Sequence, residues 1–213
     1  MSLLLFILLN SWIWKIISLF PLIVVPLILS TIFLYKKQNI LFLVTFFILL
    51  YFQLITTISQ SFTLLDNDEQ RVRSERLQFY KPSLHFTRVI FARFNLRDFL
   101  EGDFNTIQTR IYRNFFETID LNIYFFAGHP RERVWADDFE KFSFIFLPLF
   151  LIGMYKIFSK GDMYFILFFL ATIIILTGIG HKNNLGPFLI FPFIVILIHE
   201  GFLNILNFLK NGK

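Results

Sequence analysis

The chain has 213 residues, of which 56% are hydrophobic, 20% aromatic and only 16% charged; its formal net charge is +5. A soluble domain carries about 25% charged residues, so this composition predicts burial in a membrane. The lack of cysteine excludes disulfides, thiolate zinc sites and a cysteine nucleophile. Residues 60–141 hold twelve basic against thirteen acidic side chains, and this balance argues against nucleic acid as a partner.

Residues 1–59 predict two membrane spans that follow a short apolar segment. A spanning helix needs about 20 apolar residues, and residues 16–35 and 39–59 have this length. Residues 2–14 are too short to span, and Trp12 and Trp14 favour a helix in the outer membrane interface. The alternative is that residues 2–14 are the end of a span from a longer protein.

Residues 60–141 predict an extracytoplasmic helical cap. The stretch FNTIQTRIYRNFFETI, residues 104–119, has apolar side chains at spacings of three and four, which predicts an amphipathic helix. Residues 68–80 predict a charged, exposed helix. No alternating strand pattern stands out, so the cap is expected to lie against the outer leaflet or against the bundle.

Residues 142–213 predict three further spans, over 142–158, 164–180 and 185–205, followed by a cytoplasmic tail. The fold class is therefore an all-α polytopic membrane helix bundle of about five spans with an extracytoplasmic insertion. Lysines in short loops face the cytoplasm, and six basic residues alternate onto one side: Lys36, Lys37, Lys156, Lys160, Lys210 and Lys213. Lys156 is expected to snorkel from the third span. The predicted location is the plasma membrane of a bacterium, with residues 60–141 outside.

Three acidic residues follow the second span. Asp66, Asp68 and Glu69 lie in LLDNDEQ, residues 64–70, and paired carboxylates can hold a divalent cation or act as a general base. The alternative is a helix N-terminus, where acidic side chains complement the helix dipole. The spacing identifies no metal site by itself, and no cofactor is assigned.

A second candidate site lies in NIYFFAGHPRERVWADDFEKFSF, residues 122–144. His129 is a candidate acid or base, and Arg131 and Arg133 are candidates for binding a phosphate. His181, in a turn predicted on the same side, is a further substrate-binding candidate. The alternative is a turn at residues 128–130 and a helix that starts near Asp137, with Glu140 in a capping box. Aromatic residues at the membrane interface would accompany it: Tyr124, Phe125, Phe126 and Trp135.

A third candidate lies inside the last span. The apolar run 185–198 rises only about 21 Å at 1.5 Å per residue, so the helix must carry His199 and Glu200 into the inner hydrocarbon edge. Ionisable residues at this depth are functional candidates. Two interpretations stay open, namely a proton relay and a pair that snorkels to the inner headgroups.

The string YFFAGHPRERV, followed by DDFEKFSFIFLPLFLIG, resembles a segment of uncharacterised multispanning membrane proteins from small-genome bacteria. Longer proteins of that type are similar to GT-C glycosyltransferases, which are multispanning enzymes that use lipid-linked sugars. The resemblance covers roughly residues 60–205. In the GT-C family an acidic motif in an outer loop is functionally central, and the resemblance implies that role for Asp68 and Glu69. The family has many more spans, so this chain would be a remnant, a half or a subunit.

Three functions follow as expectations. The first is a structural or accessory role in the cell envelope, through contacts with membrane lipids and a membrane-protein partner. The second is a GT-C-like glycosyltransferase, or a fragment of one, acting on lipid-linked sugars. The third is a small transporter with a His199–Glu200 relay, although no inverted repeat is evident. Whether the chain is an enzyme is left open.

Overall fold

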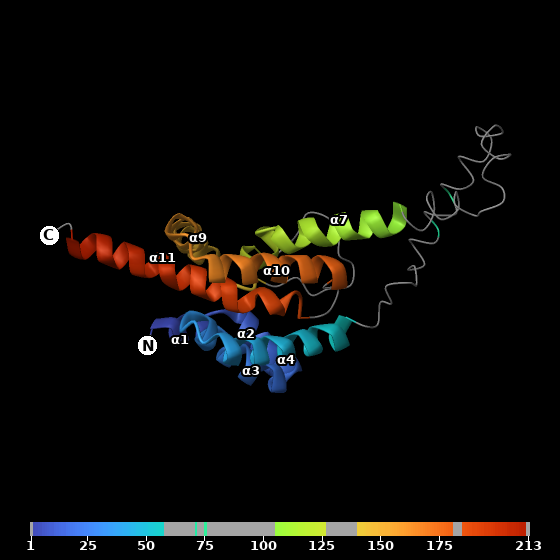
Figure 1. The fold of residues 1–213 in the computed structure, drawn as a ribbon, viewed down its shortest axis with the longest axis horizontal. Helices are drawn as coiled ribbons and strands as arrows, with labels where there is room; N and C mark the ends of the chain where they lie inside the picture. Colours follow the sequence, from blue (N-terminus) through green and yellow to red (C-terminus); the bar gives the residue numbers. More distant parts are fainter. Residues whose placement is uncertain are drawn as a thin grey trace.

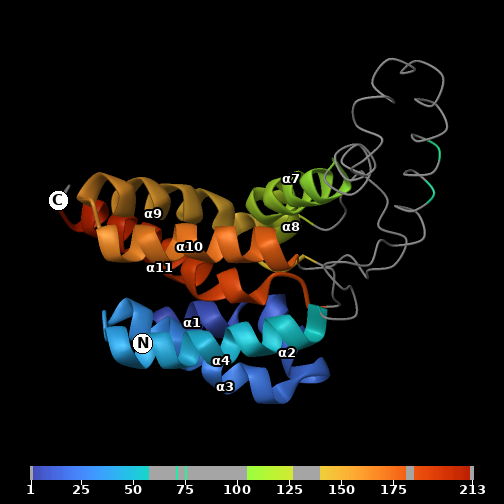
Figure 2. The same ribbon diagram turned by 45° about the vertical axis from the view of Figure 1, so that its right-hand side comes forward.

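The structure is a computed structural model that describes residues 2–57, 71, 75, 105–126, 140–180 and 185–211. Every regular element in these ranges is helical, which confirms the predicted helical bundle. Figures 1 and 2 show three layers, with α11 (Phe191–Asn211) in the middle. One outer layer contains α9 (Leu147–Lys160) and α10 (Met163–Ile179). The other contains α1 (Ser2–Leu8), α2 (Ser11–Leu19), α3 (Pro21–Tyr35) and α4 (Asn39–Thr57).

Helix α11 and the short 3₁₀ turn before it, η3 (Phe188–Ile190), form the centre of the core. The eleven side chains from Phe188 to Ile198, which include those of this turn, are all buried, with at most a few per cent of their surface exposed. A helix segment that is apolar on all sides lies in a protein core or in a membrane. The first half of α11 is covered by protein because the helix contacts α9 on one side and α1 and α3 on the other, whereas its last turns are largely exposed.

Helices α9 and α11 cross in close contact at Gly153 and Gly201. A Cβ atom added at Gly153 would overlap the backbone carbonyl of Leu197, and one added at Gly201 would overlap that of Leu149. Small residues let two helix backbones approach each other in membrane bundles. The two glycines therefore determine how closely α9 packs on α11.

The helix is interrupted at Phe20, whereas the sequence predicts one continuous helix over residues 16–35. Helix α2 ends at Leu19 and α3 begins at Pro21. Proline has no N–H to donate and disfavours the helical conformation in the residue before it. Phe20 accordingly has φ −145° and ψ 74°, outside the helical region. The predicted start of this span is therefore wrong.

Residues 2–19 form a bent pair of helices rather than one helix in the outer interface. Helices α1 and α2 meet at 62°, and the Asn10 side chain at the bend accepts from the Ile13 N–H at 2.8 Å. The pair runs alongside α11 and the segment before it, since Ser2 is hydrogen-bonded to His199 and the Trp12 indole to the Leu185 carbonyl. The prediction of an interface position for Trp12 is wrong because its side chain is fully buried, whereas Trp14 is exposed.

Among the described residues, two helices are long and apolar enough to cross a bilayer by themselves: Asn39–Thr57, and Phe188–Lys210 with its 3₁₀ turn. The bent pair α1–α2 would be a third if it acts as one span. Helices α3 and α10 are apolar but have 15 and 17 residues, short of the roughly 20 that a bilayer requires. The number of five spans therefore stays a prediction.

One end of the bundle carries the basic turns. The Lys37 ammonium lies 2.7 Å from the Asp162 carboxylate, so the turn between α3 and α4 is adjacent to the turn between α9 and α10. Lys36 and Lys160 lie in or beside these same turns. Figure 1 shows the last turns of α11, which contain Lys210, and the start of α1 at this end. The sequence predicts that it faces the cytoplasm.

Helix α7 (Asn105–Ile119) confirms the amphipathic helix predicted in the cap, and the short α8 (Asn122–Phe125) follows it. Within the predicted helix over 68–80, Arg71 and Glu75 are helical and form an ion pair one turn apart at 3.0 Å. Asp137, where the sequence predicts a helix start, lies outside the described residues, but no helix continues from there into the third span. Residues 140–143 are not helical, and α9 begins only at Leu147, after the 3₁₀ turn η2 (Phe144–Phe146).

Candidate functional site

The acid, base and anion-binding candidates outside the spans are not in the described part of the chain. Six predicted site residues lie outside the described residues: Asp68, Glu69, His129, Arg131, Arg133 and His181. Their convergence on one pocket therefore stays a prediction. The two intramembrane candidates, His199 and Glu200, lie in the middle of α11 and have well-defined neighbours.

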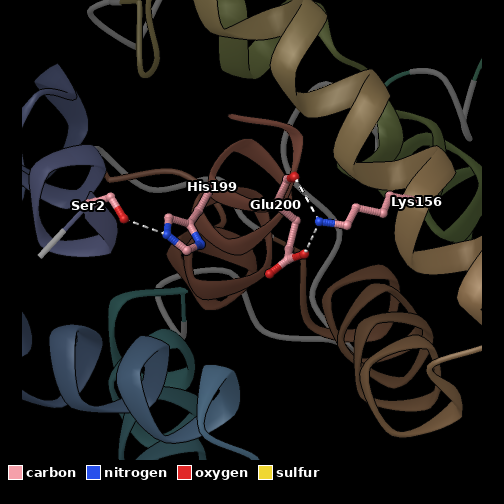
Figure 3. A network of polar contacts seen from close by, with 4 residues as sticks. All are labelled: Ser2, Lys156, His199 and Glu200. Carbon is pink, nitrogen blue, oxygen red and sulfur yellow. Dashed lines mark hydrogen bonds and ion pairs between the residues drawn. The ribbon is translucent and has the colours of Figure 1, made fainter. Parts of the chain in front are cut away.

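His199 is buried between the first and third helices. Its Nε2 atom lies 2.8 Å from the hydroxyl of Ser2, at the start of α1 (Figure 3). The imidazole also meets the rings of Tyr35 and Phe6 edge-on, at centroid distances of 5.1 and 6.2 Å. Only 3% of the residue is exposed. His199 therefore connects α11 to α1 and α3.

The second ring nitrogen of His199 is different, because Nδ1 is buried and has no hydrogen-bond partner among the described residues. A neutral imidazole carries one N–H and one acceptor nitrogen. One of these two capacities is met by Ser2, and the other is left unsatisfied. A buried polar atom without a partner is unfavourable by about 1–3 kcal/mol.

Glu200 faces the opposite neighbour, α9. Its carboxylate lies 2.9 Å from the Lys156 ammonium, which also donates to the backbone carbonyl of Glu200 at 3.4 Å. The two side chains are only 15% and 18% exposed. Lys156 is therefore paired inside the α9–α11 interface, and its predicted snorkelling from the third span stays a prediction. Gly153 is one turn before it, so the close crossing brings the pair together.

His199 and Glu200 are neighbours in sequence, but their partners are on different helices. Figure 3 shows Ser2 on one side of α11 and Lys156 on the other. Consecutive residues of a helix point about 100° apart, because a turn takes 3.6 residues. The pair thus joins α11 to both outer layers, and both side chains are bound to neighbouring helices in the structure.

A second polar junction, which the sequence did not predict, surrounds Trp12 at the other end of the bundle. The Trp12 indole donates to the Leu185 carbonyl at 2.7 Å, and its backbone N–H donates to the Lys141 carbonyl at 3.1 Å. The rings of Phe142 and Phe191 contact the indole edge-on. The Lys141 ammonium lies 5.7 Å from the indole ring centroid and donates a hydrogen bond to the backbone carbonyl of Ile123.

The aromatic residues of α8 belong to this junction and not to a membrane interface. Tyr124 and Phe125 are 2% and 0% exposed, so the prediction that they are interface residues is wrong; Phe126 is 43% exposed. The Tyr124 hydroxyl donates to the Thr118 carbonyl at 2.7 Å. Burial, with a smaller effect of the Asp120 charge, raises the pKa of the Tyr124 phenol well above its usual value.

An open groove of about 660 Å³ runs between α9 and α11 beyond the glycine crossing. Its lining is mainly apolar, with two amide side chains, and consists of Leu151, Ile152, Tyr155, Asn204, Ile205, Asn207 and Phe208. His199 and Glu200 do not line it. Within the described ranges, no group of three or more His, Asp or Glu side chains is arranged to hold a metal ion.

The comparisons with known proteins found no match: no family model, no curated protein and no solved structure is similar to this chain.

Proposed function

We propose that this protein is an integral membrane protein with a structural or accessory role in the cell envelope, acting through contacts with lipids and a membrane-protein partner. The observation that supports it most is that the ionisable residues of α11 bind to neighbouring helices. Glu200 pairs with Lys156 of α9, and His199 bonds to Ser2 of α1. Polar side chains of this kind hold neighbouring membrane helices together.

In a transporter, such residues would have a different role. A proton relay needs ionisable groups that face a polar pathway and exchange protons along it. In the described part of the chain the His199 ring is enclosed by Ser2, Phe6 and Tyr35, and Glu200 is bonded to a lysine. This arrangement favours a role in assembly, and the transporter is the weaker proposal.

The experiment is complementation of a strain that lacks the gene, with envelope integrity as the measurement. We expect Asp68→Ala/Glu69→Ala to complement fully, since a structural role needs no outer carboxylate pair. Glu75→Ala is the matched control, an exposed acidic residue of the same segment. Gly153→Leu should fail to complement, because a side chain there overlaps the Leu197 carbonyl and separates α9 from α11.

Two results would contradict the proposal. If Asp68→Ala/Glu69→Ala fails to complement while the protein remains at its normal level, the glycosyltransferase-like alternative is favoured. If His199→Phe fails to complement and the purified variant keeps its unfolding temperature, the proton relay is favoured. Phenylalanine is suited to this second test because it fills the imidazole site without a titratable group.

A further inference from the structure

Helix α7 packs on the bundle with its polar side inward. Asn114 is 5% exposed and its amide donates to the Thr177 carbonyl of α10 at 3.2 Å. Thr118, one turn later, is fully buried. Gly180 allows the close approach, because a Cβ there would lie 3.2 Å from the Asn114 amide nitrogen. The side of α7 that faces the protein thus carries amide and hydroxyl groups, and the half-buried Arg110, Arg113 and Glu117 lie on the same helix.

The opposite side of α7 is apolar and exposed. Five large side chains on it are between 38% and 63% exposed: Ile111, Tyr112, Phe115, Phe116 and Ile119. The only other exposed side chain described in this helix is Gln108. In a protein surrounded by water an amphipathic helix turns its apolar side to the core. Helix α7 does the reverse, which is the arrangement expected where the surroundings are hydrocarbon.

The exposed side of α7 continues an apolar strip on α10. Ile174 is one helical turn before Thr177, the residue that holds Asn114, and it is 71% exposed. Leu167 and Leu170 extend this strip and are 59% and 46% exposed. Figures 1 and 2 both show α7 beside α10, over the half of α10 that is distant from the basic turns.

We propose that α7 is embedded in the lipid leaflet at this end of the bundle, with its Phe115–Phe116 side against acyl chains. Residues 105–119 are then part of the intramembrane body, and the aqueous part of the predicted cap is correspondingly smaller. Asn114 fixes the helix to α10, and Thr118 is buried one turn later, so that this polar side is shielded from the hydrocarbon. This inference depends on the membrane location given above under the proposed function.

The test uses the lack of native cysteine, which makes every introduced cysteine a unique labelling site. The full chain is reconstituted in phospholipid nanodiscs as Phe116→Cys, Ile119→Cys, Ile174→Cys or Lys36→Cys, each with a nitroxide label. Electron paramagnetic resonance then measures collisions with oxygen, which concentrates in lipid, and with a nickel chelate, which stays in water. Ile174 is the lipid control on α10, and Lys36 is the exposed control at the basic end.

We expect the ratio of oxygen to nickel collisions at positions 116 and 119 to equal that at 174 and to exceed that at 36. A water-like ratio at 116 and 119, with a lipid-like ratio at 174, would overturn the inference but leave the membrane location intact. Low collision rates with both reagents at 116 and 119 would also overturn it, because protein would then cover this side. A water-like ratio at 174 would instead contradict the membrane location itself.

Discussion

Gly153 of α9 and Gly201 of α11 lie opposite each other where the two helices cross. The Cβ position of Gly153 is 3.0 Å from the Gly201 nitrogen, and that of Gly201 is 3.0 Å from the Gly153 nitrogen. The crossing is therefore symmetric, and each backbone occupies the space that a side chain on the other would need. Contact between backbones at this distance leaves no flexible side chain that can move aside.

Gly153→Ala or Gly201→Ala should therefore destabilise the bundle. Overpacking of this kind is unfavourable by about 1–3 kcal/mol, and here only a shift of a whole helix relieves it. The free energy of unfolding, from titration of the purified protein with denaturing detergent, measures the effect. Gly178→Ala is the matched control, since it lies in α10 with nothing within 4 Å of the added Cβ. Alanine there should stabilise by about 0.5–1 kcal/mol. Equal effects at all three glycines would contradict the close crossing.

The Lys156–Glu200 pair predicts a non-additive pair of variants. Lys156→Met leaves a carboxylate with little exposure and no partner, and we expect a loss of about 3 kcal/mol in unfolding free energy. Lys156→Met/Glu200→Leu should recover most of this loss, because both charges are then absent. Lys37→Met is the control at an exposed pair and should change stability by less than about 1 kcal/mol. Losses that simply add in the double variant would show that the two residues are not coupled.

Trp12 and Trp14 allow a matched comparison of one chemical change. Trp12→Phe removes the hydrogen bond to Leu185 from a fully buried position, so stability should fall by about 1–3 kcal/mol. Trp14 also donates to a backbone carbonyl, that of Leu8, but it is 57% exposed. Trp14→Phe should therefore have an effect below about 0.5 kcal/mol. The measurement is again unfolding in denaturing detergent, and a larger effect at Trp14 would contradict the described burial.

Tyr124 predicts a loss of stability in alkali. Because burial raises the pKa of its phenol, the folded protein holds this proton more tightly than the unfolded chain does, where tyrosine titrates near pH 10. The contribution of Tyr124 is thus complete below about pH 10 and decreases as the pH rises above that value. Unfolding temperatures measured from pH 8 to pH 11.5 should decline more steeply for the native protein than for Tyr124→Phe. Parallel curves would contradict the assignment.

The helix positions were largely predictable, because apolar run length determines them. The predicted spans over 39–59 and 164–180 differ by at most two residues from the ends of α4 and α10, Asn39–Thr57 and Met163–Ile179. The errors occurred where a local rule opposed the hydrophobic pattern. Pro21 starts a new helix inside an apolar run. Trp12 is of a residue type that is common at membrane interfaces, but tertiary contacts bury it.

The site was less predictable, because hydropathy does not identify partners. The depth of Glu200 in the last span could be derived from the sequence, whereas its pairing with Lys156 depends on which spans are adjacent. A signal was present, since each of these opposite charges lies within one turn of a glycine, Gly153 or Gly201. The Ser2–His199 contact had no comparable signal, because the two residues are 197 positions apart.

The central place of α11 has a consequence for the order of assembly. Among the described helices, α11 follows in the chain every helix that it contacts. A ribosome adds about 5–20 residues per second, so Ser2 emerges roughly 10–40 s before His199. During that interval α1 and α3 have no central helix to cover their inward sides. Lys156 is 44 positions before Glu200 and lacks its carboxylate partner for roughly 2–9 s. The early helices must therefore be retained beside the insertion machinery until α11 arrives, and a chain interrupted before residue 188 is expected to be a substrate for membrane proteases.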